Sequence, residues 1–496
     1  MRDTLRFLLG DALIEIDRCD PTLTVLDWLR LDRRMTGTKE GCAEGDCGAC
    51  TVVVVRLDGG RLRYEAINAC IRFLPTLDGC QLLTVEHLKG SDGSLHPVQQ
   101  AMVECHGSQC GFCTPGFVMS LLALRLNEAE PGIGRIEDAL AGNLCRCTGY
   151  EPIIAAGRRM DEIAPREQDH FLRDRAAVAE RLMALRDEET LKLDGSGRSF
   201  HAPATTEGLA ELVAAHPQAT LVAGATDVGL WVTKGMKRLD PVIYLGRIEA
   251  LREIEDKGDH LRFGAMASHI DVRTALARLS PQLDELMRRF GGEQVRNAGT
   301  IGGNIANGSP IGDLPPALIA LDATLVLARQ GANGIERRTI PLESFFLDYR
   351  KQDRHPDEFV EAVLVPKLGT DAQFHVSKVS KRFDEDISAI CGAFRLRLGP
   401  DGRVSEARLA YGGMAGIPKR AKAAEEALLG QPWDETAVAA AIAVLPQDFT
   451  PLSDMRASAA YRLKVAGNLL RRFLIETTAP TGQTRVAGLL AEAAHG

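Results

Sequence analysis

The stretch that decides the amino-terminal fold reads TKEGCAEGDCGAC at residues 38–50, and Cys70 follows it. Cys42, Cys47 and Cys50 stand in C-x4-C-x2-C spacing. Three thiolates from one loop and a fourth from a later strand can converge on two irons, whereas structural zinc usually takes paired C-x2-C knuckles. Glycines beside the cysteines let backbone N–H groups point inward toward a negative cluster. The spacing therefore indicates a plant-type [2Fe–2S] site.

A second group of cysteines comes later, as the pairs Cys110-x2-Cys113 and Cys145-x-Cys147 with 31 residues between them. On spacing alone these pairs suit either zinc or an iron–sulfur cluster. Disulfides are not expected, because the chain is large enough to fold without them and no secretion signal precedes the cysteines.

Bulk properties exclude several classes of function. A chain of 496 residues predicts three or four units with separate cores. Its net charge of −8, with 45% hydrophobic and 25% charged residues, is ordinary for a globular protein, so no nucleic-acid partner is expected. No apolar run approaches the roughly 20 residues of a membrane span, and charges interrupt residues 1–18 before a signal core could form. We expect no membrane association and a cytoplasmic location.

Periodicity and turn signals divide the chain into units. Hairpins are predicted around Gly10–Asp11 and Asp58–Gly60, with a helix between them, which suits a β-grasp domain. Four helices are predicted next, and then a charged linker, a mixed α/β unit and a final unit of strands and helices. The predicted boundaries are 1–90, 91–164, 165–197 (linker), 198–370, 371–480 and 481–496 (tail).

Two glycine-rich loops stand out in the α/β unit, LVAGATD at 221–227 and NAGTIGGN at 297–304. A strand followed by a glycine turn suits a pyrophosphate, because exposed backbone N–H groups donate where side chains would obstruct. Each loop alone is more often a simple turn. Dinucleotide-binding G-x-G-x-x-G, P-loop, H-E-x-x-H and G-x-S-x-G motifs are absent from the sequence, which disfavours those site classes.

The flanks of the cysteines resemble the molybdenum hydroxylase family. QCGFCTPG at 109–116 and NLCRCTGY at 143–150 are similar to its helical iron–sulfur domain, and residues 38–48 are similar to its ferredoxin-like domain. The resemblance implies two [2Fe–2S] clusters, the second nearest a molybdenum cofactor, and gives Gln109 a hydrogen bond to the pterin held by a partner subunit. The implied ligands are Cys42, Cys47, Cys50, Cys70, Cys110, Cys113, Cys145 and Cys147.

The α/β unit resembles the FAD domain of the same family, through FGGEQVR at 290–296 and SPIGDL at 309–314. SKVSKRFDEDIS at 377–388 and YGGMA at 411–415 are similar to its flavoprotein segments. The resemblance implies that Phe290 covers the flavin ring, that Asp313 hydrogen-bonds the cofactor and that Lys378 contacts the flavin. It also implies that Arg382, with the acidic residues of the 377–388 block, borders the flavin face where nicotinamide docks. The two glycine loops would hold the diphosphate and adenosine, through Leu221, Val222, Ala223, Gly224, Ala225, Thr226, Asp227, Thr300, Ile301, Gly302, Gly303 and Asn304.

The resemblance implies a multidomain α+β fold: a β-grasp ferredoxin domain, a four-helix iron–sulfur domain, a two-part α/β FAD domain and a carboxy-terminal α+β flavoprotein domain. The implied function is an oxidoreductase subunit that passes electrons from the molybdenum cofactor of a larger molybdopterin-binding subunit, through two clusters, to FAD and NAD. Hypoxanthine and xanthine are the expected substrates, urate the product and an (αβ)2 heterotetramer the expected assembly. No catalytic residue is assigned to this chain.

Three alternatives remain open. The chain could serve another molybdenum hydroxylase that oxidises aldehydes or N-heterocycles. It could be a stand-alone NADH-dependent iron–sulfur flavoprotein reductase, although that function has no use for the second cysteine group. It could also be a non-catalytic redox sensor, against which the length devoted to a flavin domain argues.

Overall fold

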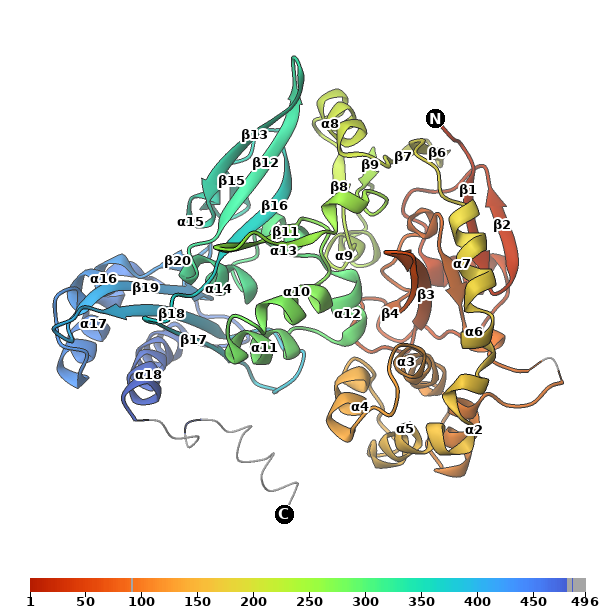
Figure 1. Ribbon diagram of the computed structural model, residues 1–496, viewed down its shortest axis with the longest axis horizontal. Coiled ribbons are helices and arrows are strands. Elements are labelled where there is room, and N and C mark those ends of the chain that lie inside the picture. Colours follow the sequence, from red (N-terminus) through yellow and green to blue (C-terminus); the bar gives the residue numbers. More distant parts are fainter. Residues whose placement is uncertain (91, 480–483, 485–496) are drawn as a thin grey trace.

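The structure is a computed structural model that describes residues 1–90, 92–479 and 484. In Figure 1 the amino-terminal sheet and helices lie on the right, the central α/β unit (green) lies in the middle, and the carboxy-terminal unit (blue) lies on the left. The predicted tail at 481–496 falls outside the described residues, apart from Thr484.

The amino-terminal unit is a five-stranded sheet in the order β2-β1-β5-β3-β4. β1 and β5 run parallel, and the other neighbours are antiparallel. Both predicted hairpins are present, since Leu9 pairs with Ala12 and Asp58 pairs with Arg61. The elements are β1 (Leu5–Leu9), β2 (Ala12–Ile16), α1 (Val25–Asp27), the π-helical turn η1 (Trp28–Asp32), β3 (Thr51–Asp58), β4 (Arg61–Asn68), η2 (Leu74–Leu77), β5 (Gln81–Leu83) and η3 (Val85–His87). The β-grasp prediction is confirmed.

The four predicted helices follow: α2 (Pro97–Glu104), α3 (Thr114–Asn127), α4 (Ile133–Leu140) and α5 (Glu151–Ile163). α3 is buried from Gly116 to Leu126 and packs against β3 and β4, which makes it the support between the helical unit and the sheet. Cys113 directly precedes α3, and Cys145 and Cys147 lie in the loop before α5. The second cysteine group is therefore carried on loops anchored by packed helices.

The segment predicted as a linker contains regular structure. It holds η4 (Arg166–Gln168), α6 (His170–Arg173), α7 (Arg175–Ala184) and β6 (Leu191–Gly195). α7 packs on β3 and β4, and β6 pairs antiparallel with β7 (Arg198–Ala202). Leu191 and Leu193 alternate inward on β6 and are fully buried, so this strand joins the core shared by the first sheet and the central unit.

The central unit contains two larger sheets and a two-stranded one made of β14 and β15. The first has the order β6-β7-β9-β8, and the second has the order β10-β11-β16-β12-β13. Its strands are β8 (Thr220–Val222), β9 (Val242–Tyr244), β10 (Ile254–Asp256), β11 (His260–Gly264), β12 (Thr324–Gly331), β13 (Gly334–Pro341), β14 (Phe346–Asp348), β15 (Lys351–Gln352) and β16 (Phe359–Pro366). Its helices are α8 (Thr206–Ala215), α9 (Val228–Thr233), η5 (Glu249–Leu251), α10 (His269–Leu276), α11 (Pro281–Arg288), α12 (Glu293–Ala298), α13 (Ile301–Asn307), α14 (Leu314–Ala320) and α15 (Leu342–Phe345).

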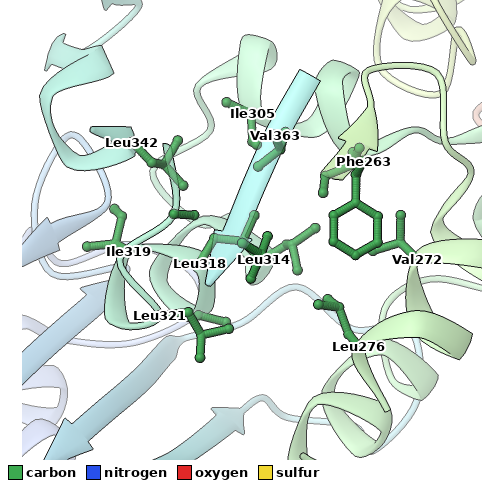
Figure 2. Close-up of a cluster of buried hydrophobic side chains, with 14 of the residues drawn as sticks. Phe263, Val272, Leu276, Ile305, Leu314, Leu318, Ile319, Leu321, Leu342 and Val363 are labelled. Carbon is green, nitrogen blue, oxygen red and sulfur yellow. The ribbon is translucent and has the colours of Figure 1, made fainter. Parts of the chain in front are cut away.

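A hydrophobic core beneath α13 and α14 holds the middle of the molecule together. Figure 2 shows Leu314 and Leu318 of α14 and Ile305 of α13 converging near Val363 of β16 and Phe263 of β11. Every residue of α14 is buried. Burial of such aliphatic side chains contributes about 1.5–3 kcal/mol each, so the residues at the amino-terminal ends of α13 and α14 are held on a rigid base.

The carboxy-terminal unit is a four-stranded antiparallel sheet in the order β17-β18-β19-β20, covered by helices. Its elements are β17 (Ala372–Val379), β18 (Ile390–Leu398), β19 (Val404–Gly412), β20 (Lys419–Arg420), α16 (Lys422–Leu428), α17 (Glu435–Asp448) and α18 (Ala459–Thr478). α14 packs on β18 and β19, which joins this unit to the central one. The predicted multidomain α+β fold is confirmed. No helix in the described ranges combines the length and apolar character that a membrane crossing requires.

Candidate functional site

The first four cysteines converge between the sheet and the central unit. Cys42 Sγ interacts with the thiols of Cys47 and Cys70, which lowers the pKa of Cys42, and Cys50 interacts with Cys70. The backbone N–H groups of Glu44 and Cys47 donate to Cys42 Sγ, both at 3.4 Å. Inward N–H donors around thiolates fit a negatively charged iron–sulfur cluster.

The second four cysteines form two sulfur pairs at the surface. Cys110 interacts with Cys147, and Cys113 interacts with Cys145. Burial, followed by the Cys145 thiol, raises the pKa of Cys113 to about 12. Cys110 and Cys147 are exposed, whereas Cys50 and Cys70 of the first group are buried. A pairwise arrangement fits ligands divided between two irons.

The spacing of these sulfurs also bears on the zinc alternative. In the described part of the chain, one set of three or more His, Cys, Asp or Glu ligand atoms lies within 4.8 Å, and it consists of His96, Asp169 and His170. Neither cysteine quartet is that compact, although four thiolates about 2.3 Å from one zinc would be. The quartets therefore fit a binuclear cluster better than a single ion.

The His96 group has a structural explanation. Asp169 Oδ2 accepts from buried Arg125 Nε at 3.1 Å and lies 2.9 Å from His96 Nε2, and His96 Nδ1 accepts the N–H of Val98. A metal ion would stand beside a buried guanidinium, which is electrostatically unfavourable. This cluster ties the helical unit to the segment that follows it.

The two cysteine loops touch each other. The N–H of Leu144 donates to the carbonyl of Cys47 at 3.0 Å, and a side chain added at Gly48 would collide with the carbonyl of Gly142. Leu144 directly precedes Cys145. The backbone that carries the second quartet therefore lies against the backbone that carries the first.

A cavity of about 540 Å³ lies in the central unit and is lined from both glycine loops. Gly224 lies so close to the carbonyl of Ala298 that a Cβ there would overlap it, and Gly302 meets Ala265 in the same way. The two loops, far apart in sequence, therefore form one wall. The sequence-predicted residues that line the cavity are Leu221, Ala223, Gly224, Ala225, Thr226, Asp227, Phe290, Thr300, Gly302, Gly303, Asn304, Asp313 and Lys378.

A buried ion pair closes one end of the cavity. Lys378 Nζ lies 2.6 Å from Asp313 Oδ2, and the hydroxyl of Ser388 donates to Asp313 Oδ1 at 2.5 Å. Asp313 stands immediately before the fully buried helix α14, and Lys378 is on β17. The central and carboxy-terminal units thus supply this end together.

Other polar atoms in the wall lack partners within the described residues. They are Asn304 Oδ1, His269 Nδ1 and Glu385 Oε1, all buried. Burial lowers the pKa of His269 to about 3, so its ring is neutral, and it packs edge-on against Phe290 at 4.6 Å. Burial raises the pKa of Glu385 to about 8. Unpaired buried polar atoms are rare, so this wall fits a ligand that brings its own donors and acceptors, as FAD does.

Four sequence-predicted residues lie elsewhere. Val222 and Ile301 are buried in hydrophobic cores because β8 and α13 turn these side chains inward. Arg382 is absent from the cavity wall and pairs with Asp386, its side chain 62% exposed. Gln109 is exposed beside the second quartet. Glu385, one of the acidic residues in the 377–388 block, lines the wall, and so do His269 and Ser388, for which the sequence predicts no individual role.

The cavity reaches the first quartet. Glu44, Gly45 and Ile71 belong to its lining, and Ile71 directly follows Cys70. A Cβ at Gly229 of α9 would collide with the Ile71 backbone, and Lys234 Nζ donates to the carbonyl of Cys42 at 2.5 Å. The second quartet, the first quartet and the cavity are therefore consecutive neighbours.

Three family models match separate parts of the chain. The [2Fe-2S] binding domain matches residues 84–158, the FAD binding domain in molybdopterin dehydrogenase matches 195–368, and the CO dehydrogenase flavoprotein C-terminal domain matches 375–477. The solved carbon monoxide dehydrogenase from Hydrogenophaga pseudoflava, which lacks the Mo-pyranopterin moiety of its cofactor, is 31% identical with a TM-score of 0.51. That comparison covers 94% of the solved chain and 55% of this one. This chain belongs to the molybdenum hydroxylase family.

Curated relatives in the family include xanthine dehydrogenase of Emericella nidulans, 32% identical over 95% of this chain and 38% of its own. Xanthine dehydrogenase/oxidase of Mus musculus is 32% identical over 87% of this chain and 36% of its own. The chain thus spans a little over a third of these relatives. Membership of the family makes it an oxidoreductase component with iron–sulfur and FAD-binding domains.

Proposed function

We propose that this chain is the iron–sulfur and flavin subunit of a xanthine dehydrogenase, and that it carries electrons from a molybdenum cofactor on a partner subunit to NAD. The observation that carries the proposal is that the second quartet, the first quartet and the cavity lined by both glycine loops are consecutive neighbours. Iron–sulfur clusters exchange single electrons and FAD exchanges one or two, so this set of cofactors connects a two-electron oxidation to hydride release.

The cysteine loops have two tasks in this function. Each quartet holds its cluster through four sulfurs, and N–H groups such as those of Glu44 and Cys47 stabilise the negative charge on the first site. Exposure differs between the sites, with Cys110 and Cys147 at the surface and Cys50 and Cys70 buried. The surface quartet is suited to receive electrons from outside the chain, and the buried one to relay them inward.

The cavity residues bind and orient FAD. The glycine loops present backbone without side chains to the diphosphate, and Thr300 caps α13 by accepting the N–H of Gly303 at 3.1 Å. Phe290, fixed by His269, covers one side of the ring. The ion pair of Lys378 and Asp313 supplies charged hydrogen-bonding groups at one end of the cavity, where the polar edge of the flavin needs partners.

The surface around the second quartet suits a protein partner. Phe112, Leu144 and Tyr150 expose 48%, 41% and 38% of their area beside the cysteines. Aromatic and aliphatic side chains are enriched in interface cores. A larger molybdopterin-binding subunit docked here would bring its cofactor close to this quartet and within reach of Gln109, and an (αβ)2 assembly is the proposed form.

Co-expression with a molybdopterin-binding partner tests the proposal. The complex should show two distinct [2Fe–2S] EPR signals and a flavin spectrum, and it should produce urate and NADH from xanthine. Loss of NADH formation on removal of FAD, with urate still formed when a dye accepts electrons, would support this order of transfer. Absence of either iron–sulfur signal or of flavin would refute it.

A second candidate has the same electron route and a different partner substrate. The similarity to carbon monoxide dehydrogenase from Hydrogenophaga pseudoflava favours it, since that relative is named for another reaction. Turnover of an aldehyde or an N-heterocycle, with no reaction on xanthine, would select this candidate.

A further inference from the structure

Gln294 occupies the junction of three units. It lies on α12, is 1% exposed and belongs to the central unit. Its Nε2 donates to Thr51 Oγ1 at 3.2 Å, Ser120 Oγ at 3.2 Å and Asn143 Oδ1 at 2.9 Å. Thr51 belongs to the first sheet, whereas Ser120 and Asn143 belong to the helical unit. One buried amide therefore contacts both cysteine-bearing units.

The partners of Gln294 are bound to the cysteine loops themselves. Asn143 Nδ2 donates to the carbonyl of Gly48 at 3.1 Å and to Thr51 Oγ1 at 3.2 Å. Ser120 Oγ donates to Asn143 Oδ1 at 2.7 Å. Gly48 directly follows Cys47, and Asn143 stands two residues before Cys145. A displacement of the Gln294 amide would therefore displace the loops that carry both quartets.

Close backbone contacts surround this hydrogen-bond network. Side chains added at Gly48, Gly116 and Gly142 would collide, respectively, with the carbonyl of Gly142, the carbonyl of Gly48 and the Oε1 of Gln294. The backbones approach because these glycines lack Cβ atoms. The Nε2 of Gln294 is hydrogen-bonded, whereas its Oε1 is buried without a partner among the described residues. Removal of the amide would take a donor away from its buried acceptors, which disturbs such a network strongly.

Ion pairs at the same junction are more exposed. Arg135 pairs with Glu293 at 2.6 Å, and Arg288 pairs with Asp138 at 2.5 Å, with arginine side chains 28% and 37% exposed. Water and salt can replace part of such interactions, so they hold the units together without fixing their spacing closely. The buried amide is better placed to set that spacing.

We infer that Gln294 is a positioning residue that holds the flavin-binding unit against the loops of both cysteine quartets and so sets the gaps that electrons cross. The inference rests on the proposed function. Gln294 touches no proposed cluster ligand and does not line the cavity, so it acts through Asn143, Thr51 and Gly48. Its loss should change the spacing of the sites before it changes their content.

The test compares Gln294→Met, which keeps the length and removes the amide, with Gln294→Asn, which keeps the amide on a shorter side chain. Gln282→Met is the matched control, because Gln282 Oε1 accepts the N–H of Val376 at 2.9 Å away from both quartets. Iron and flavin contents are measured first. EPR then measures the magnetic coupling between the two reduced clusters, and one-electron flash reduction of the flavin gives the rate of transfer to the clusters.

Gln294→Met should keep both cluster signals, weaken their coupling and slow flavin-to-cluster transfer by up to about a hundredfold, the scale of an ångström-sized misplacement of reacting groups. The cluster coupling and the transfer rate of Gln294→Asn should lie between those of Gln294→Met and the wild type. Gln282→Met should have the wild-type coupling and rate. If Gln294→Met does not fold, Gln294→Asn alone must show the slower transfer.

The inference would be overturned if the variant that folds had the same coupling between the clusters and the same flavin-to-cluster transfer rate as the wild type. Loss of flavin with unchanged coupling would overturn it as well, because Gln294 would then serve only the flavin unit. Failure of the proposed function looks different, since the wild-type protein itself would lack the iron–sulfur or flavin signals.

Discussion

Glu385 lies in the wall of the cavity, and its pKa depends on how deeply its carboxyl is buried there. Its Oε1 is buried without a partner, and burial raises its pKa to about 8 from an ordinary 4.5, with Asp46 and Asp384 adding to the rise while Arg296 opposes it. A carboxyl that titrates near neutral pH in a cavity wall is a recurrent feature of functional sites. The folded protein therefore favours the protonated, neutral form of the Glu385 carboxyl.

The raised pKa of Glu385 makes the free energy of unfolding fall as pH rises. Because the folded-state pKa lies above the ordinary value, ionisation opposes folding, and stability is lost as pH rises from about 4.5 to about 8. Glu385→Gln removes this loss. Denaturant unfolding across that range should show the variant gaining on the wild type with rising pH, and parallel curves would contradict the assignment.

Lys378 and Asp313 allow a paired test of the closed end of the cavity. Lys378→Met leaves Asp313 as a buried carboxylate with Ser388 as its remaining side-chain donor, which should cost about 3–5 kcal/mol. Adding Asp313→Asn should recover most of that stability without recovering flavin. Unfolding curves and flavin content after gel filtration measure the two effects separately, and a fully flavinated single variant would contradict the proposed role.

The two glycine loops act together because β8, α12 and α13 bring them into contact over the buried core of Figure 2. Their function depends on how closely their backbones approach, since the diphosphate would be bound by main-chain groups. The glycine loops are therefore sensitive to a single added methyl group.

Gly224→Ala tests this dependence. The new Cβ would overlap the carbonyl of Ala298, so the loops must separate and flavin content should fall at least about tenfold, with iron content unchanged. Gly132→Ala is the control, because nothing lies within 4 Å of a Cβ there. Equal flavin in both variants would show that the loops do not form the binding wall.

Across the whole chain, the second quartet, the first quartet and the cavity follow one another in space. Cys110 and Cys147 of the second quartet are exposed, whereas Cys50 and Cys70 of the first are buried, and the cavity reaches from the first quartet to Lys378 of the carboxy-terminal unit. In the proposed function, this arrangement gives electrons one entrance and one outlet. It also predicts that the apolar side chains around the surface quartet matter for assembly and little for folding.

Phe112→Ser should weaken association with the proposed molybdopterin-binding partner by about 2 kcal/mol, the scale of an aromatic interface anchor. Leu452→Ser is the control, since Leu452 is 81% exposed and lies in the carboxy-terminal unit. Titration of the partner followed by light scattering measures both affinities. Equal affinities, with both cluster signals intact, would place the docking surface elsewhere.

The sequence by itself determined the local features. Cysteine spacing identified both quartets, the turns at Gly10–Asp11 and Asp58–Gly60 predicted the hairpins that form, and flanking motifs indicated the family. These features were readable because hairpins, helix starts and ligand loops depend on neighbours within a few residues. The strand β6 inside the predicted linker was missed because its partner β7 and the core that buries Leu191 are not local features of a charged segment.

Only the tertiary structure decided which residues share a site. It brought Gly224 against Ala298, paired Lys378 with Asp313, turned Val222 and Ile301 into cores and placed Gln294 among three units. These outcomes depend on packing between segments far apart in sequence, where burial and collision select one arrangement. The grouping of the cysteines was therefore local information, and the placement of the sites relative to one another was not.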